Sequence, residues 1–356
     1  MSITFITLNV VIINKIISNH LSELWQLIRW SQSMSQSTYP NEKICCLTSI
    51  LTQANKFQQL LSKDDVWSAC YRNDYLSMIY LADLNKSLQQ KKLLFDIGAN
   101  KGYTIALWLS MWMPEIGVNP RSLYMYLSQV LKIDDCGVCT DCNETISNSV
   151  PINNRISTTL EIHAFEPMES TYQALRQVST WINISTLYIH EIAISNTTGI
   201  ANMKKCPVGS ELCGLLAIDH STSNEKVFQT STITLDEFVE QKNIQQKIDL
   251  LKIDTEGADP LVLQGAKKLF AKKQIRILIF ENHGIGTWKT TSLLTVIEFL
   301  SKEGFICYML GKTGLARLTN CWSPAFDIKR WSNVLCVHRE EEHVRHFLDQ
   351  LLITNI

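Results

Sequence analysis

This chain of 356 residues has almost no excess of charge of either sign. It contains 33 Lys and Arg against 34 Asp and Glu, for a formal net charge of −1. Proteins that attract nucleic acid or an anionic membrane electrostatically carry a basic excess or a basic run. The sequence has neither, so we expect no nucleic-acid partner and no strong membrane signal.

The sequence also lacks an apolar run as long as a membrane span of ~20 residues. Residues 3–17 are mostly apolar, but Asn9, Asn14 and Lys15 interrupt them and no basic region precedes them. A signal segment needs both features. We therefore expect an amphipathic or core helix, with a signal or anchor as the alternative. On this reading a cytoplasmic location is slightly favoured over the secretory pathway.

A third absence is the G-x-G-x-x-G fingerprint of dinucleotide-binding folds. Instead, an apolar run ends in Asp96, and Gly98 and Gly102 follow. This pattern predicts a buried strand, a tight turn and a helix, with ligands bound outside the carboxyl end of the strand. An acid there repels phosphate and favours positive charge, hydroxyls or amino groups, all of which S-adenosylmethionine has. The alternative is a purely structural glycine turn.

Predicted strands alternate with helices along most of the chain. This order predicts an α/β fold, a Rossmann-like doubly wound and mostly parallel sheet. We expect strands at residues 93–97, 160–165, 187–194, 248–253, 275–280, 305–310, 315–319 and 334–338. We expect a helical N-terminal region at residues 1–90, a main domain at 91–340 with a cysteine-containing insertion at 114–159, and a C-terminal helix at 341–356.

Four of the predicted strands end in an acidic residue, namely Asp96, Glu166, Asp254 and Glu281. Clustered carboxylates repel one another and raise each other's pKa unless a cation or hydrogen-bond donors lie among them. We therefore predict a site for a polar or cationic ligand at this edge of the sheet. The alternative is that each acid caps a helix or pairs with a Lys or Arg.

Several segments resemble the FkbM-type S-adenosylmethionine-dependent methyltransferases. The resemblance rests on F-D-I-G-A-N-K-G at residues 95–102, F-E-P at 165–167, L-K-I-D-T-E-G-A-D at 251–259, L-Q-G-A at 263–266, T-L-D at 234–236 and S-N-V-L at 332–335. It runs from about residue 93 to residue 338, apart from the insertion. The resemblance implies a sheet of the class I methyltransferase type.

The resemblance also implies how the cofactor, S-adenosylmethionine, is held. Asp96, Gly98, Asn100 and Gly102 would line its methionine end. Glu166 would accept hydrogen bonds from both ribose hydroxyls, because one carboxylate can accept two at once.

The catalytic residues implied by the resemblance are Asp254 and Glu256, which would face the methyl group. Methylation of oxygen, often on sugars or natural-product hydroxyls, is the implied activity, so the acceptor would be a small molecule or a glycan. A neutral hydroxyl is a poor nucleophile and needs a base within reach. Glu256 is the first choice, with Asp254 and His283 as alternatives. The rival functions are a non-catalytic binding module of the same fold and a nicotinamide-dependent oxidoreductase.

The insertion contains a C-x-x-C-x-x-C run formed by Cys136, Cys139 and Cys142. Cysteines at this spacing suit a structural zinc ion, which takes four ligands. A disulfide within the insertion and free thiols are the two alternatives. The candidates for a fourth zinc ligand are Cys206, Cys213 and His163.

Overall fold

The computed structural model of this chain describes residues 47–71, 91–137, 139, 141–143, 159–211, 213–215 and 227–354. The expectations for residues 3–17, and for most of the predicted helical N-terminal region, lie outside these ranges. Within them, no helix is both long and apolar enough to cross a bilayer. The boundaries set above for the three regions and the insertion stay predictions.

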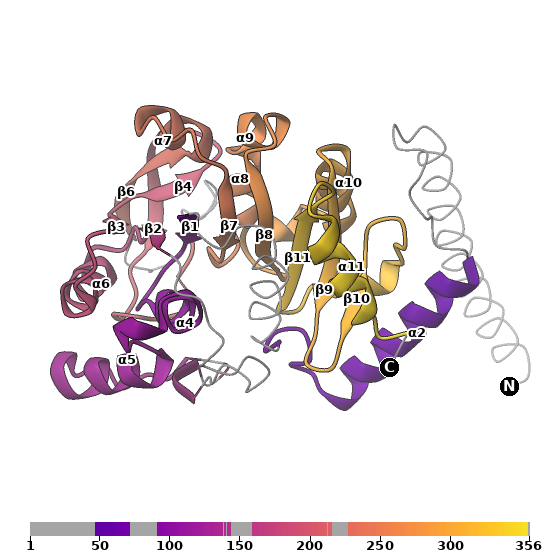
Figure 1. Ribbon diagram of the computed structural model, residues 1–356, viewed down its shortest axis with the longest axis horizontal. Helices are drawn as coiled ribbons and strands as arrows, with labels where there is room; N and C mark the ends of the chain where they lie inside the picture. Colours follow the sequence, from indigo (N-terminus) through magenta and orange to yellow (C-terminus); the bar gives the residue numbers. More distant parts are fainter. Residues whose placement is uncertain are drawn as a thin grey trace, which may run out of the picture.

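An eight-stranded sheet runs through the molecule in the order β10-β9-β11-β8-β7-β1-β2-β3 (Figure 1). The five strands from β8 to β3 are parallel neighbours, whereas β11 runs antiparallel to both β8 and β9. The fold is thus the expected mostly parallel α/β sheet. Its strands are β1 (Lys92–Ile97), β2 (Leu160–Phe165), β3 (Leu187–His190), β7 (Ile248–Ile253), β8 (Ile275–Asn282), β9 (Phe305–Leu310), β10 (Leu315–Arg317) and β11 (Ser332–His338).

Helices cover both faces of this sheet, because its central strands are apolar on both sides. All six residues of β1 are buried, and alternate side chains point to opposite faces. Phe95 packs with one layer of helices and Leu94 with the other. The first layer includes α2 (Leu47–Lys63), α7 (Leu235–Gln241), α8 (Asp259–Gln264), α9 (Lys267–Ala271) and α10 (Leu293–Lys302). The second includes α4 (Tyr103–Trp112), α5 (Pro120–Tyr126), α6 (Glu169–Ile182) and α11 (Glu342–Gln350).

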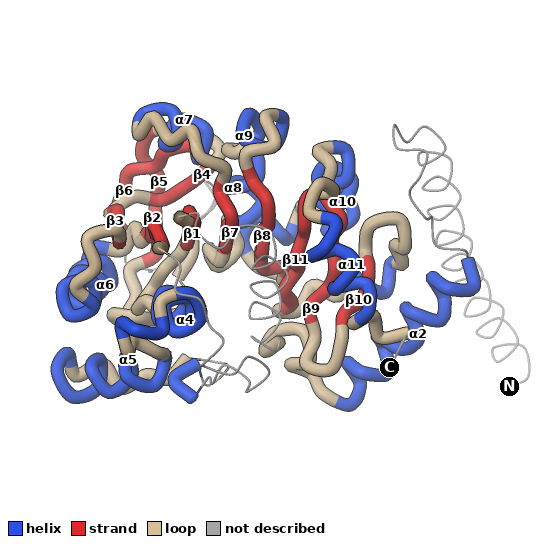
Figure 2. Tube along the Cα trace, in the orientation of Figure 1, coloured by secondary structure: helices blue, strands red, loops and turns tan. Residues whose placement is uncertain are grey.

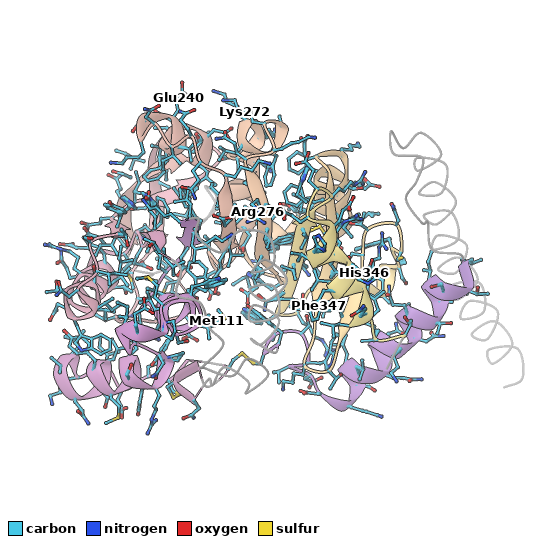
Figure 3. All side chains as sticks on the ribbon, in the orientation of Figure 1. Met111, Glu240, Lys272, Arg276, His346 and Phe347 are labelled. Carbon is cyan, nitrogen blue, oxygen red and sulfur yellow. A yellow bond between two sulfur atoms is a disulfide. The ribbon has the colours of Figure 1, made fainter. Side chains whose placement is uncertain are left out.

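Both ends of the described chain are fixed to the sheet. Gln53 of α2 donates to and accepts from the backbone of Arg317 at 2.7 and 3.0 Å, so α2 covers the edge strand β10 (Figure 2). Arg276 of β8 bonds Asp249 of β7 at 2.5 Å and Glu341, just before α11, at 2.7 Å. Figure 3 labels Arg276 over the sheet.

One predicted strand and one helical segment are each divided in the structure. The expected strand at residues 187–194 is β3 followed by β4 (Ala193–Ser195), and β4 belongs to a separate sheet with β6 (Val227–Thr234) and β5 (Gly199–Lys204). The helical segment that follows β7 is divided into α8 and α9. Gly265 separates them, and a Cβ there would lie 2.1 Å from the Ser195 carbonyl oxygen. The break between α8 and α9 therefore lies where the end of β4 packs against the helical segment.

The cysteines of the predicted insertion are in disulfides, which corrects the zinc expectation. Cys136 is bonded to Cys142, and Cys139 is bonded to Cys70. Zinc binds thiolates, so these sulfurs offer it no ligands while they are paired. Two of the proposed fourth ligands, Cys206 and Cys213, are also bonded to each other. A fourth disulfide joins Cys307 and Cys336.

Candidate functional site

A pocket of about 400 Å³ lies outside the carboxyl ends of the central strands. The four strands that end in acids, β8, β7, β1 and β2, are consecutive neighbours in the sheet. Their acidic residues are therefore brought to one edge, as predicted. The chain order of the strands reverses at β1, and such points are where open α/β sheets bind ligands. Glu166, Asp254 and Glu281 line the pocket, whereas Asp96 lies beneath it.

The turn after β1 needs glycine for close backbone contact. Gly98 has φ +85°, and a Cβ there would lie 1.8 Å from the Asp254 carbonyl oxygen of the neighbouring strand. The amides of Gly98 and Ala99 both donate to the Phe165 carbonyl at 3.0 Å. Gly98 and Asn100 line the pocket, but Gly102 does not. Gly102 instead precedes α4 and packs against Leu175.

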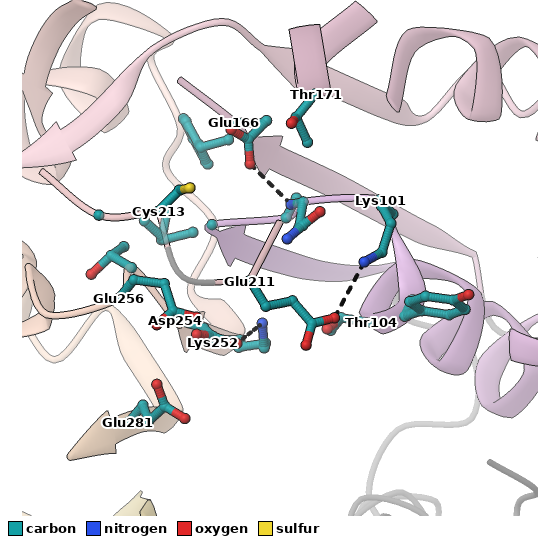
Figure 4. Close-up of a pocket in the computed structure, with 18 of the residues that line it drawn as sticks. Lys101, Thr104, Glu166, Thr171, Glu211, Cys213, Lys252, Asp254, Glu256 and Glu281 are labelled. Atoms are coloured by element: carbon teal, nitrogen blue, oxygen red, sulfur yellow. Dashed lines mark hydrogen bonds and ion pairs between the residues drawn. The ribbon is translucent and has the colours of Figure 1, made fainter. Parts of the chain in front are cut away.

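Glu166 follows β2 and is oriented by two backbone amides. One carboxylate oxygen accepts from Asn100 N at 3.1 Å, and the other accepts from Met168 N at 2.9 Å. Burial raises the pKa of this carboxyl to about 7, against the opposing effect of these two bonds. Each oxygen keeps a further lone pair for a ligand. The carboxylate is thus fixed in place and still able to accept hydrogen bonds (Figure 4).

Lys252, which the sequence analysis did not select, joins two of the predicted acids. Its ammonium lies 3.4 Å from Asp96 and 3.1 Å from Asp254. Asp96 is fully buried, and burial raises the pKa of its carboxyl despite the nearby ammonium. Lys252 and Asp254 are two residues apart, so they share a face of β7 and its extension. This spacing was the available sequence signal for the ion pair.

Glu256 is held in a left-handed conformation with φ +52°, a conformation that is strained for a residue with a side chain. Burial, followed by the charges of Asp254, Asp259 and Glu211, raises the pKa of its carboxyl to about 9. Glu256, Glu281 and His283 each place a ligating atom within 4.8 Å of the others. The structure thus brings the two predicted catalytic acids, Asp254 and Glu256, to the same end of the pocket (Figure 4).

A loop between β5 and β6 covers another side of the pocket and was not predicted to contribute. The ammonium of Lys101 is buried and bonds the Gly209 carbonyl at 2.7 Å, Asp135 at 2.8 Å and Glu211 at 3.3 Å. Asn100 donates to the Ser210 carbonyl at 3.2 Å. The Cys206–Cys213 disulfide closes this loop. Lys101 lies inside the glycine motif, but nothing in the sequence identified the loop that it contacts.

Comparisons with known proteins identify a family for this chain. The methyltransferase FkbM domain matches residues 96–307, which is more than half of the chain. No curated protein sequence matches it. Among solved structures, a human methyltransferase 10 domain containing protein has 10% identity and a TM-score of 0.32, covering 83% of this chain and 100% of its own. The METTL16 methyltransferase domain has 10% identity and a TM-score of 0.33, covering 85% of this chain and 86% of its own.

The family match contains most of the residues that form the pocket. It begins at Asp96, at the end of β1, and includes Glu166, Asp254, Glu256 and Glu281. The resemblance described from the sequence is thereby confirmed, and family membership indicates S-adenosylmethionine-dependent methyl transfer as the general activity. This chain belongs to the FkbM methyltransferase family.

Proposed function

We propose that this protein transfers a methyl group from S-adenosylmethionine to a hydroxyl oxygen of a small polar molecule or a sugar. The observation that carries the proposal is the position of Glu166, fixed by two backbone amides beside the Gly98 turn within the family match. This arrangement supports recognition of a ribose by one carboxylate.

The residues present fit S-adenosylmethionine chemically. The Asn100 Oδ1 atom is buried and has no hydrogen-bond partner among the described residues, so it can accept from an amino group. Gly98 leaves space where any side chain would collide with β7. Asp96 and Gly102 would act indirectly, through Lys252 and through the start of α4. The bound cofactor would supply an electrophilic methyl group on a positively charged sulfur.

The acceptor end of the pocket supports general-base assistance. Asp254 and Glu256 lie just beyond the carboxyl end of β7, where they would face the reacting atoms. We assign Glu256 as the group that takes the hydroxyl proton and Asp254 as the group that orients the acceptor. Proton transfer by a positioned base contributes a factor of roughly 10²–10⁴ to rates, so Glu256→Gln is expected to reduce turnover by about that factor.

A screen with methyl-labelled S-adenosylmethionine tests the proposal. Sugars and other small polyhydroxy compounds, the matching amines and structured RNA would be offered in parallel. The proposal expects label on a hydroxyl, as an ether, which Glu256→Gln slows while cofactor affinity stays within a few-fold. Label found only on nitrogen or only on RNA would contradict it.

A further inference from the structure

The acceptor end of the pocket contains three titratable groups that the packing forces together. Glu256 lies on the turn after β7, Glu281 is the last residue but one of β8, and His283 follows that strand. Buried Asp259 fixes their spacing, since its carboxylate accepts from Thr255 Oγ1 at 3.1 Å and from the Glu281 amide at 3.3 Å. The ligating atoms of the three groups all lie within 4.8 Å of one another.

The hydrogen bonding of His283 shows which role its ring can play. The Ile285 amide donates to Nδ1 at 3.2 Å, so Nδ1 is an acceptor and the neutral ring carries its proton on Nε2. Nε2 lies 3.5 Å from Glu281 Oε2. The ring is fully buried and stacks on Trp331. A metal-binding histidine donates through its other nitrogen, whereas here that nitrogen accepts. Nε2 has no hydrogen-bond partner among the described residues, so its N–H faces Glu281 as an unused donor and not as a metal ligand.

The two carboxyls lack the partners that would let both ionise. Glu256 Oε2 and Glu281 Oε2 are each buried without a hydrogen-bond partner in the described part of the chain. The charged groups that act on the cluster are mostly acidic. Among the described residues, Asp254, Asp259 and Glu211 bring negative charge to the cluster, and Lys252 and Lys329 bring positive charge. Two carboxyls in such a place hold a proton between them.

We propose that Glu256 and Glu281 share one proton when the pocket is empty, that His283 positions Glu281, and that the pair releases this proton to solvent when a cationic cofactor binds. The inference rests on the proposed function and extends it. Glu281 is the second carboxyl of the base, and His283 is a positioning residue. The base that accepts the hydroxyl proton then forms only after the cofactor has arrived.

The electrostatics of the site agree with this assignment. Burial raises the pKa of Glu256 to about 9 and that of Glu281 well above its usual range. The charges of Asp254 and Asp259 raise both pKa values further, and the charge of Glu256 adds to the shift of Glu281. Burial lowers the pKa of His283 to about 4, so its ring is neutral at physiological pH. A positive charge brought close to two carboxyls favours their ionised forms and so lowers their pKa.

Calorimetry in two buffers measures the proton directly and needs no methyl acceptor. S-adenosylmethionine would be titrated into the full chain at pH 8 in phosphate and in Tris, whose ionisation enthalpies differ. The difference in binding heat gives the number of protons released. S-adenosylhomocysteine, which lacks the sulfonium charge, is the matched ligand control. We expect release of about one proton with the first ligand and clearly less with the second.

Three variants separate the roles, and Glu169→Gln on the exposed start of α6 is the matched control. Glu281→Gln and Glu256→Gln should each abolish the released proton while ligand binding persists. His283→Leu should shift the pH range over which the proton is released. His283→Gln keeps a hydrogen-bond donor, so its pH range should lie closer to that of the unchanged chain. Glu169→Gln should release the same proton as the unchanged chain.

The outcomes distinguish this inference from the proposed function. Binding of S-adenosylmethionine without proton release, or release unchanged in Glu281→Gln, would overturn the shared proton and leave the methyltransferase proposal standing. No binding heat would overturn both. Saturable Mn²⁺ binding that His283→Leu abolishes would overturn the donor role of His283.

Discussion

Gly98 is a residue at which the fold leaves no room for a side chain. Its φ of +85° and the approach of the Asp254 carbonyl both require glycine. A positive φ and a close approach of some backbone atom could both be anticipated from the sequence, because the pattern itself is a Gly-rich turn after a buried strand. The identity of the backbone atom that it contacts could not, since β7 begins 150 residues later in the chain.

Gly98→Ala is expected to destabilise the fold and to abolish cofactor binding, because β1 and β7 must separate to admit the methyl group. Gly117→Ala is the matched control. Gly117 also has a positive φ of +73°, but nothing lies within 4 Å of its Cβ position. Gly117→Ala should lower the free energy of unfolding by only about 1–2 kcal/mol, which is the cost of the left-handed conformation for alanine. Thermal unfolding of both variants gives the comparison. An equal fall in Tm for the two variants would contradict the close contact of Gly98 with the Asp254 carbonyl.

Glu256→Gln is expected to stabilise the protein, and more so at high pH. The folded-state pKa of Glu256 is raised to about 9 from an ordinary 4.5, so the folded chain holds a proton that the unfolded chain loses above pH 4.5. Stability therefore falls as the pH rises between these values. Removing the charge should raise Tm by a few degrees at pH 8 and by much less at pH 4.5. A lower Tm at pH 8 would contradict this sign.

The elements that periodicity predicted best are the central strands. They are short, apolar and bounded by turns, and they form the parallel core that such runs indicate. Residues 187–194 were predicted less well. The apolar pattern continues across the point where the chain leaves one sheet for the other, and only the pairing of β4 with β6 shows the division.

The loop between β5 and β6 is the element that sequence reasoning missed at the site. It has no apolar period, and it reaches the pocket only through tertiary contacts with Asn100 and Lys101. Its role follows from one buried ammonium that bonds a carbonyl and two carboxylates.

Lys101→Met is expected to loosen this loop while its apolar stem still fills the space against Gly209. We expect the Kd for S-adenosylmethionine to rise about tenfold, or roughly 1.4 kcal/mol, with little change in overall secondary structure. Lys272→Met, at an exposed position after α9 that Figure 3 labels, is the control and should bind normally. An unchanged Kd for Lys101→Met would show that the loop does not support the pocket.

At the scale of the whole molecule, one disulfide connects distant parts of the chain. The Cys70–Cys139 bond joins residues 69 apart in sequence, and both cysteines line the pocket. Disulfides persist in oxidising compartments, so the pairing weighs against the slight preference for a cytoplasmic location. Spacing alone could not give these pairs, because C-x-x-C-x-x-C fits a metal site and a disulfide equally well.

Peptide mapping without reduction is expected to recover the Cys70–Cys139 and Cys136–Cys142 pairs, and metal analysis of the same protein should show no equimolar zinc. Reduction should lower Tm. A disulfide that closes a loop this long restricts the unfolded chain and so adds several kcal/mol to the free energy of unfolding. Equimolar zinc together with free thiols at these positions would contradict the pairing.

The central proposal for this protein is that the pocket at the carboxyl ends of β1, β2 and β7 binds S-adenosylmethionine. The most direct measurement is calorimetric titration of the full chain with this ligand, beside Glu166→Gln and the exposed control Glu169→Gln. Losing a hydrogen bond to a charged acceptor costs about 1.5–3 kcal/mol of binding free energy. We therefore expect the affinity for S-adenosylmethionine to fall at least tenfold in Glu166→Gln and to stay unchanged in Glu169→Gln. Absence of binding by the unchanged chain, or equal affinity in Glu166→Gln, would contradict the proposal.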